Sequence, residues 1–448
     1  MEVESFEAKL ARFPNAVEML RNGSYGRHQF PMRAEYSNWR DEQQAWATTA
    51  VVFDQAHHMT DVNFRGRDVH RLLGHVGINS FADFGKDMAK QFVGCNEEGY
   101  VIGDAILFGL DHEEVSLVGP PMVSRWMEYQ ARVGDFDVEV RRDEESPINT
   151  TGRRFFRYQL QGPNSVKIAA LAAAGTLPEI KTFRIGEFSI AGRTVRALNH
   201  SMTRKTGLEI WGLKEDGPAV LEGLLEAGLE FGLLQGGGLA YSTTALESGW
   251  LGAVHVPAIY SGDAMRAYRQ WMTADCREAN TSIGGSFVSE RIEDYYVTPW
   301  DLGYGRILKF DHDFIGSTAL RELAGQPHRR KVWLRWNDGD VSRVMASGLF
   351  DGEKQRAKYL TAPYSAYSTY PADAVYLGDE LVGISTRSGY TVNVGSWFSL
   401  AMVDERHAVD GTEVVVEWGE DGGGTAKPAV ERHTKTTVRA VLSTSALA

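Results

Sequence analysis

The feature that most limits how this chain folds is a series of short strand patterns, separated by tight turns and followed by a helical pattern. Residues 90–94, 99–108 and 114–118 are apolar segments separated by turn residues, which predicts three consecutive strands. The next segment, 121–134, is predicted to be a helix. Antiparallel strands with covering helices are typical of an α+β domain, not of a doubly wound parallel sheet.

A second unit with the same order of elements follows the first. Its predicted elements are a strand at 155–161, a helix at 164–174, strands at 188–198 and 208–211, and a helix at 218–231. This repetition predicts two related β/α units that face one cleft. We place the units at about 42–150 and 151–326.

Residues 1–41 are expected to form an N-terminal arm, with a helix over 6–20 and an irregular segment up to Pro31. A second helix is predicted from 42 to 50. Residues 51–64 then alternate like a strand that enters a site. This segment carries His57 and His58, and side chains alternate along a strand, so only one of the two can face that site.

The C-terminal third is predicted to be a separate β domain. After a helix at 317–324, short strands are expected at 330–336, 413–418 and 438–442, and residues 374–385 form a hairpin with a Gly-Asp turn. We therefore expect a core of residues 1–326 and a small β-barrel domain of residues 327–448.

Composition excludes several classes of function. The chain has 448 residues, 43% of them hydrophobic and 24% charged, enough for more than one core. Its net charge of -12 argues against nucleic-acid binding. Cys95 and Cys276 have neither disulfide-scaffold nor metal-site spacing, the N-terminus lacks a signal-peptide pattern, and no apolar window is long enough to span a membrane. We expect a cytoplasmic protein, a monomer or homodimer, without a metal ion.

Motif patterns alone do not define a reaction. The chain contains no nucleophile elbow, Walker loop, zinc-protease motif or EF-hand. The glycines at 236–238 lack the Gly-x-Gly-x-x-Gly spacing of a dinucleotide-binding turn, so they are interpreted as a loop. These patterns predict only an α+β protein of the size of an enzyme.

Several sequence blocks resemble those of the glycine-cleavage T-protein family, the tetrahydrofolate-dependent aminomethyltransferases. The blocks are residues 53–59, 99–104, 160–163, 207–211, 245–250, 284–289, 292–297 and 309–316. They are most similar to the aromatic branch of that family, the bacterial vanillate and syringate O-demethylases. The resemblance implies a ring of three domains around a central channel that binds folate, in agreement with the two β/α units and the terminal β domain.

Three residues match positions that bind the pterin ring in this family. Glu209 matches a carboxylate that accepts two N–H groups of the amino-pyrimidine edge as a bidentate pair. Trp250 resembles an aromatic wall that excludes water from the ring, and Gln161 a neutral amide beside it. Without the resemblance, Glu209 would be an outward strand residue, Trp250 a core residue and Gln161 a turn residue.

Three further residues match catalytic positions. Tyr241 matches the tyrosine that assists departure of the phenolate when a methyl group leaves an aryl ether, and its usual pKa near ~10 suits a phenolic leaving group. Asp104 occupies the position of the catalytic aspartate of the aminomethyltransferases, although a solvent-facing strand end is an equal interpretation. His58 is chosen over His57 by its position in the family.

Two departures from the family concern the substrate pocket. Phe30 stands where the vanillate-type enzymes carry a second tyrosine, and Pro120 stands where they carry an arginine that binds a benzoate carboxylate. Arg125 or His28 could partly replace that arginine. The sequence therefore predicts a more apolar pocket, for a larger or neutral aromatic ligand such as a two-ring lignin fragment.

Three functions remain open from the sequence. The first is a tetrahydrofolate-dependent O-demethylase that acts on lignin-derived methoxylated aromatic compounds. The second is a lyase that releases formaldehyde from the hydroxymethyl side chain of a lignin-derived dimer, with folate optional; Phe30 and Pro120 favour it over a strict vanillate demethylase. The third is a non-catalytic folate-binding relative, against which Glu209, Trp250 and Tyr241 argue.

Overall fold

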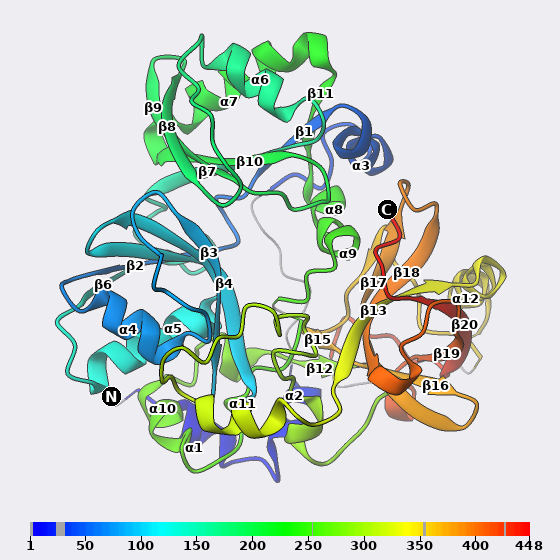
Figure 1. Cartoon of the computed structure of the whole chain (residues 1–448). Helices are drawn as coiled ribbons and strands as arrows, with labels where there is room; N and C mark the ends of the chain where they lie inside the picture. Colours follow the sequence, from blue (N-terminus) through cyan, green and yellow to red (C-terminus); the bar gives the residue numbers. More distant parts are fainter. Residues whose placement is uncertain (1–2, 24–31, 253, 353–354, 425–426) are drawn as a thin grey trace.

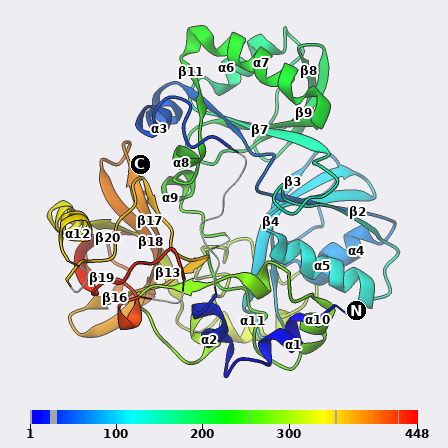
Figure 2. The same ribbon diagram turned by 180° about the vertical axis from the view of Figure 1, so that it is seen from behind.

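The computed structural model describes residues 3–23, 32–252, 254–352, 355–424 and 427–448. It contains a five-stranded sheet, a six-stranded sheet and a C-terminal barrel, arranged around a common centre (Figure 1). The same three bodies are recognised from behind in Figure 2. This is the mixed α+β architecture that the sequence predicts.

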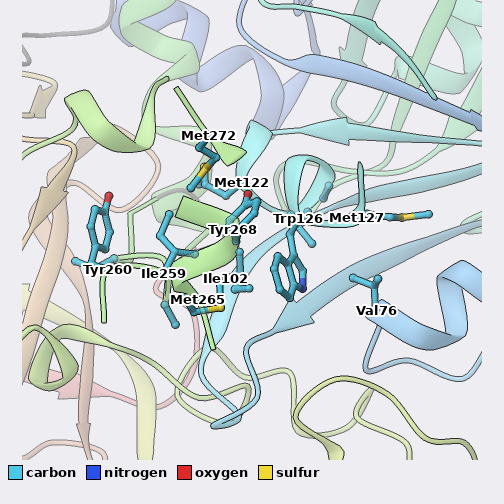
Figure 3. Packing of buried hydrophobic residues seen from close by; sticks show 14 of the residues in the cluster. Val76, Ile102, Met122, Trp126, Met127, Ile259, Tyr260, Met265, Tyr268 and Met272 are labelled. Carbon is cyan, nitrogen blue, oxygen red and sulfur yellow. The ribbon is translucent and has the colours of Figure 1, made fainter. Parts of the chain in front are cut away.

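The five-stranded sheet is antiparallel, with the order β3-β4-β5-β2-β6. Its strands are β2 (Thr60–Arg65), β3 (Ala89–Cys95), β4 (Val101–Asp111), β5 (Glu114–Gly119) and β6 (Glu139–Asp143). The helices α4 (Val69–Val76) and α5 (Pro121–Val133) pack with it. Three further helices belong to the same body, namely α1 (Phe6–Leu10), α2 (Ala16–Arg21) and α10 (Arg266–Trp271). Trp126, Tyr268, Met265 and Met272 pack between α5 and the α10 segment (Figure 3). The N-terminal helices and residues 256–296 therefore share one core with this sheet.

The six-stranded sheet has the order β11-β1-β7-β10-β9-β8, and all its pairings are antiparallel except that of β1 with β11. Its strands are β1 (Ala50–Asp54), β7 (Phe155–Gln161), β8 (Ile185–Ile190), β9 (Arg193–Asn199), β10 (Gly207–Leu213) and β11 (Leu233–Gly236). The helices α6 (Ser165–Ala172) and α7 (Gly217–Gly228) cover one face, and α3 (Trp39–Thr48) contacts β1 and β11.

The expected single strand over residues 51–64 is wrong. β1 ends at Asp54 in the six-stranded sheet, β2 begins at Thr60 in the five-stranded sheet, and a turn joins them. Alternation of apolar residues does not reveal which sheet a strand joins, so the pattern cannot show this change of partner. The unit predicted at 42–150 therefore contributes its first strand to the sheet of the second unit.

Two other predicted elements are each split in two. The strand expected at 188–198 is a hairpin of β8 and β9, with a two-residue turn in which Ala191 and Gly192 have φ angles of 49° and 71°. The helix expected at 6–20 is divided into α1 and α2, because Asn15 caps a new helix by accepting a hydrogen bond from the Glu18 amide.

The C-terminal strands form a closed barrel, as predicted. The sheet order is β14-β17-β16-β19-β20-β13-β18, and an additional pairing of β17 with β18 closes it. The strands are β13 (Arg329–Trp336), β14 (Tyr364–Ser365), β16 (Asp373–Leu377), β17 (Glu380–Thr391), β18 (Ser396–Asp404), β19 (Glu413–Trp418) and β20 (Thr436–Ser443), with α12 (Asp338–Phe350) inserted after β13. The barrel begins close to the predicted boundary at residue 327.

Residues between β11 and the barrel cross the centre of the molecule. They include α8 (Gly238–Tyr241), α9 (Thr244–Ser248), β12 (Ile283–Gly284) and α11 (Ser317–Leu323), and β12 pairs with β15 (Tyr370–Pro371) of the C-terminal domain. In both Figure 1 and Figure 2 the segment with α8 and α9 lies between the six-stranded sheet and the barrel. This crossing segment carries Tyr241 and Trp250.

Among the residues that the structure describes, no helix combines the length and the apolar composition that crossing a membrane requires.

Gly249 ends α9 and packs against Trp333 of the barrel, and we expect a side chain at this position to be unfavourable. Its φ angle is 74°, and a Cβ atom there would overlap the Trp333 ring. Gly192 has a similar φ of 71° and no atom within 4 Å of its Cβ position. We predict that Gly192→Ala costs about 1 kcal/mol from its backbone conformation alone. Gly249→Ala should cost about 1–3 kcal/mol more, because it adds a steric overlap in the core.

Urea unfolding of both variants, followed by circular dichroism, measures the difference. Equal losses of stability would mean that the contact between α9 and Trp333 does not constrain this junction.

Candidate active site

Tyr241 and His58 lie in direct contact, although they are 183 residues apart in the sequence. The phenol oxygen of Tyr241 is 2.8 Å from His58 Nε2, and the Gln55 amide donates a hydrogen bond of 3.2 Å to the same oxygen. His58 and Gln55 belong to the turn between β1 and β2, so the connection between the two sheets supplies both partners. His57 instead contacts Ser146 and Asp54.

Close backbone packing fixes the position of α8. Glu42 is fully buried and accepts hydrogen bonds from the amides of Tyr36, Ser37 and Gly237. A Cβ atom at Gly237 would overlap the backbone of Ala34. Gly237 therefore allows close packing of the N-terminal segment beside Tyr241. The loop predicted at 236–238 is instead a junction between elements, because Gly236 ends β11 and Gly238 begins α8.

The environment of Tyr241 keeps its phenol protonated. Burial raises the pKa of Tyr241 well above its usual value, and the negative charge of Glu209 raises the pKa further. The Gln55 hydrogen bond and the positive charge of Arg387 act in the opposite direction and do not overcome burial. A phenol in this state is a proton donor at neutral pH, not a phenolate.

Glu209 is held by an arginine that the sequence analysis did not single out. Arg157 Nη1 donates a 2.6 Å hydrogen bond to Glu209, and Arg157 Nη2 donates a 3.1 Å hydrogen bond to Asp61. All three residues are buried. Asp61 belongs to β2 of the five-stranded sheet, whereas Arg157 and Glu209 belong to the six-stranded sheet, so one guanidinium bridges the two.

Aromatic rings enclose the bridging guanidinium. The Cζ atom of Arg157 lies 5.1 Å from the ring centre of Phe108 and 5.4 Å from that of Trp211. His200 Nδ1 lies 3.9 Å from Glu209 Oε2, and burial lowers the pKa of His200. His200 Nδ1 is buried without a hydrogen-bond partner among the described residues. The surroundings of Glu209 thus hold the carboxylate in place and leave one adjacent polar atom unsatisfied.

Gln161 is fully buried and is engaged by the loop that follows β9. Its amide nitrogen lies within hydrogen-bond distance of Ser201, Thr203, Lys205 and Thr206, and its amide oxygen accepts from the Met202 amide. The contacts of Gln161 in the structure therefore hold the loop that precedes Glu209.

Asp104 and Trp250 are brought together in a second polar cluster. Asp104 Oδ2 accepts hydrogen bonds from the Trp250 indole at 2.8 Å, the Gln91 amide at 2.7 Å and the Tyr304 phenol at 2.5 Å. Asp104 is 2% exposed, and its Oδ1 atom has no hydrogen-bond partner among the described residues. A solvent-facing strand end, the alternative interpretation of Asp104, is thereby excluded.

Of the residues predicted for the substrate pocket, the structure describes Pro120 and Arg125. Arg125 forms an ion pair with the fully buried Glu278, and although burial opposes its charge, Glu278 raises the pKa of Arg125. Pro120 precedes α5 and follows Gly119, which pairs with Thr60 just beyond His58. Phe30 and His28 lie outside the described residues. Arg125 already has a counter-charge, and only Pro120 lies next to the segment of His58.

Three residues of the site were missed from the sequence: Gln55, Arg157 and Tyr304. Arg157 had a detectable signal, because Arg157, Gln159 and Gln161 alternate with Tyr158 and Leu160 on β7 and so share one face of the strand. A charged residue on that face requires a partner. Gln55 and Tyr304 had no such signal, since their roles depend on contacts with distant segments.

Among the described residues, no group of three or more His, Cys, Asp or Glu side chains is arranged to hold a metal ion.

The fold is that of a solved aminomethyltransferase. The solved structure of the glycine cleavage system aminomethyltransferase T from Bartonella henselae has a TM-score of 0.61, with 18% sequence identity, covering 94% of this chain and 93% of that one. The family model of the GCVT N-terminal domain matches residues 3–255. The chain therefore belongs to the GCVT family.

Two relatives lie closer in sequence than that solved structure. The syringate O-demethylase of Sphingobium sp. (strain SYK-6) is 45% identical over 442 residues, covering 98% of this chain and 95% of that protein. The sesamin methylene transferase of Sinomonas sp. (strain No.22) is 30% identical over 368 residues, covering 80% of this chain and 79% of that protein. The similarity to the aromatic branch of the family is thus confirmed.

The bridge through Arg157 is expected to contribute strongly to stability. Arg157→Met leaves Asp61 and Glu209 buried without a counter-charge, which should lower the free energy of unfolding by about 3–5 kcal/mol. Arg196→Met is the matched control. Arg196 also packs on Trp211, but it pairs with the half-exposed Asp87, so its loss should cost less than about 1 kcal/mol.

Urea unfolding of the two variants beside the wild type checks this expectation. If Arg157→Met were as stable as Arg196→Met, the bridge would not hold the two sheets together.

Proposed function

We propose that this protein is a tetrahydrofolate-dependent O-demethylase, which transfers a methyl group from an aromatic methyl ether to tetrahydrofolate. The observation that carries the proposal is the contact of Tyr241 with His58 within electrostatic range of Glu209. The similarity to a syringate O-demethylase over nearly the whole chain supports the reaction class. The similarity to a sesamin methylene transferase supports the transfer of a one-carbon group.

The residues present fit a folate cofactor. Glu209 offers a fixed carboxylate for the amino-pyrimidine edge of the pterin. Asp104 Oδ1, Gln55 Oε1 and His200 Nδ1 are buried polar atoms without a partner among the described residues. Buried polar atoms in this state favour a polar ligand that satisfies them. Tetrahydrofolate, when bound, supplies the nitrogen that accepts the methyl group.

Tyr241 is proposed as the acid of the reaction. As the methyl carbon leaves the ether oxygen, that oxygen acquires negative charge, and the Tyr241 proton neutralises it to give a phenol. When His58 Nε2 carries hydrogen, both His58 and Gln55 donate to the Tyr241 oxygen, which leaves the phenolic proton for the substrate. Afterwards the Tyr241 oxygen has to regain a proton, and His58 can donate the one on Nε2 when its ring takes up another at Nδ1.

The finer features of this function are also proposals. We infer that the substrate is a small aromatic compound derived from lignin and that Trp250, held by Asp104, forms one wall of the cofactor pocket. We also infer that the protein acts in the cytoplasm. Cys95 and Cys276 are free thiols in the structure, which supports a reducing compartment.

The reaction is tested by incubating the purified protein with a methoxylated benzoate, with and without tetrahydrofolate, and by measuring products by mass. We expect loss of one methyl group from the aromatic compound and its gain by the folate, only when both are present. Formaldehyde released from a hydroxymethyl-bearing dimer without folate would instead support the lyase. Absence of both reactions, with folate still bound, would favour a non-catalytic relative.

Tyr241→Phe should lower kcat by about 10²–10⁴-fold, the usual contribution of a general acid. Since the pKa of Tyr241 is raised, its phenol stays protonated as the pH rises. Titration of Tyr241 should therefore cause no loss of wild-type activity below about pH 10. Tyr158→Phe is the control, because Tyr158 of β7 packs in the core of the six-stranded sheet and its helices. Unchanged kcat in Tyr241→Phe would remove Tyr241 as the acid.

Glu209→Gln should weaken tetrahydrofolate binding by about 10-fold or more, because a neutral amide cannot accept both N–H groups of the pterin edge. Isothermal titration calorimetry measures the affinity. Glu187→Gln, an exposed carboxylate on β8 of the same sheet, is the control and should bind folate like the wild type. An equal affinity in the two variants would place the pterin elsewhere.

A further inference from the structure

Arg387 is an arginine of the barrel without an ion pair among the residues that the structure describes. It lies in β17, where the pairing with β18 shifts register between Ser385 and Ser388. Ser385 pairs with Ala401 and Ser388 with Ser399, so β17 holds one extra residue there. Such a β-bulge turns a side chain away from the regular alternation of the strand, and bulges are frequent beside active sites.

The bulge faces the segment that carries Tyr241. α9 contacts β17, and a Cβ atom at Gly389 would lie 2.9 Å from Leu246 of α9. Beyond the bulge, the Tyr390 carbonyl accepts a 3.1 Å hydrogen bond from Gln43, whose amide also donates to Thr243. Figure 1 and Figure 2 both show this end of β17 beside α8 and α9. The charge of Arg387 acts on Tyr241, as its effect on the pKa of that phenol indicates.

Two buried polar atoms of the bulge form no hydrogen bond with the described residues. They are Arg387 Nε and Ser388 Oγ. Arg387 Cζ lies 5.6 Å from the ring centre of Tyr364, so an aromatic face supports the guanidinium without neutralising it. Burying such a donor costs free energy unless an acceptor forms a hydrogen bond with it. Arg125, by contrast, is neutralised by Glu278.

We propose that Arg387 binds the carboxylate of an aromatic acid substrate, while Tyr241 acts on the methoxy group of the same ring. This assignment rests on the proposed function and names the substrate class. A guanidinium presents two parallel N–H groups that match a carboxylate. The barrel thus supplies the cation that Pro120 cannot provide, and an acidic substrate replaces the neutral ligand expected from the sequence.

The experiment compares syringate with 2,6-dimethoxyphenol, which keeps the methoxy groups and the phenol but lacks the carboxylate. Arg387→Met retains most of the aliphatic length and removes the charge, and Arg387→Lys keeps the charge without the planar pair of donors. Arg335→Met, at an exposed position of β13 in the same barrel, controls for the loss of one positive charge. Binding is measured by calorimetry without folate, and demethylation is measured with tetrahydrofolate.

For wild type we expect tighter binding of syringate than of 2,6-dimethoxyphenol. Arg387→Met should raise Kd and KM for syringate by about 10- to 100-fold and leave those for 2,6-dimethoxyphenol nearly unchanged. Arg387→Lys should be intermediate, and Arg335→Met should match wild type. Melting temperatures confirm that the variants are folded, since the loss of Arg387 leaves no carboxylate unpaired.

Two results would overturn the proposal. Equal loss of affinity for both ligands in Arg387→Met would show that the guanidinium does not recognise the carboxylate. A fall in kcat for both ligands at unchanged KM would assign Arg387 to the departing phenolate instead. A wild type that discriminates the two ligands through Arg387 but transfers no methyl group would contradict the proposed reaction and leave this carboxylate site standing.

Discussion

One guanidinium, that of Arg157, holds together the two sheets on which the candidate cofactor site depends. It donates to Asp61 on one sheet and to Glu209 on the other, between the rings of Phe108 and Trp211. Removing either carboxylate from water is unfavourable, and a bridging cation with short hydrogen bonds offsets that cost. The carboxylate proposed to bind the pterin is therefore also part of the packing between the sheets, which restricts its position before any ligand arrives.

The same junction places the proposed acid. The turn between β1 and β2 is the point where the chain leaves one sheet for the other, and it carries Gln55 and His58 to the phenol of Tyr241. Tyr241 itself lies on a short helix fixed by Glu42 and by close contact with the N-terminal segment. The proposed acid thus lies where several segments meet and not within one element, as is usual for functional loops on a rigid scaffold.

The barrel also helps to position the residues of the candidate site. Its β17 and β18 hairpin binds Gln43 of α3 and Glu247 of α9, which fixes the wall of the site opposite the sheets. Trp333 packs against Gly249 on the other side of α9. The segment with Tyr241 and Trp250 is therefore held from both ends, and the bulge at Arg387 is brought to the same neighbourhood.

Strand and helix periodicity in the sequence determined the α+β class, most of the elements and the C-terminal barrel, because burial of one face imposes a regular spacing on each element. The resemblance to a known family predicted the candidate site residues, namely Glu209, Trp250, Gln161, Tyr241, His58 and Asp104. Only the tertiary structure decided that residues 51–64 serve two sheets, that Gln161 is engaged by its own neighbouring loop, and that Arg157 bridges the two sheets at Glu209. These outcomes depend on contacts between residues that are far apart in the sequence. The local spacing of residues carries no information about such contacts.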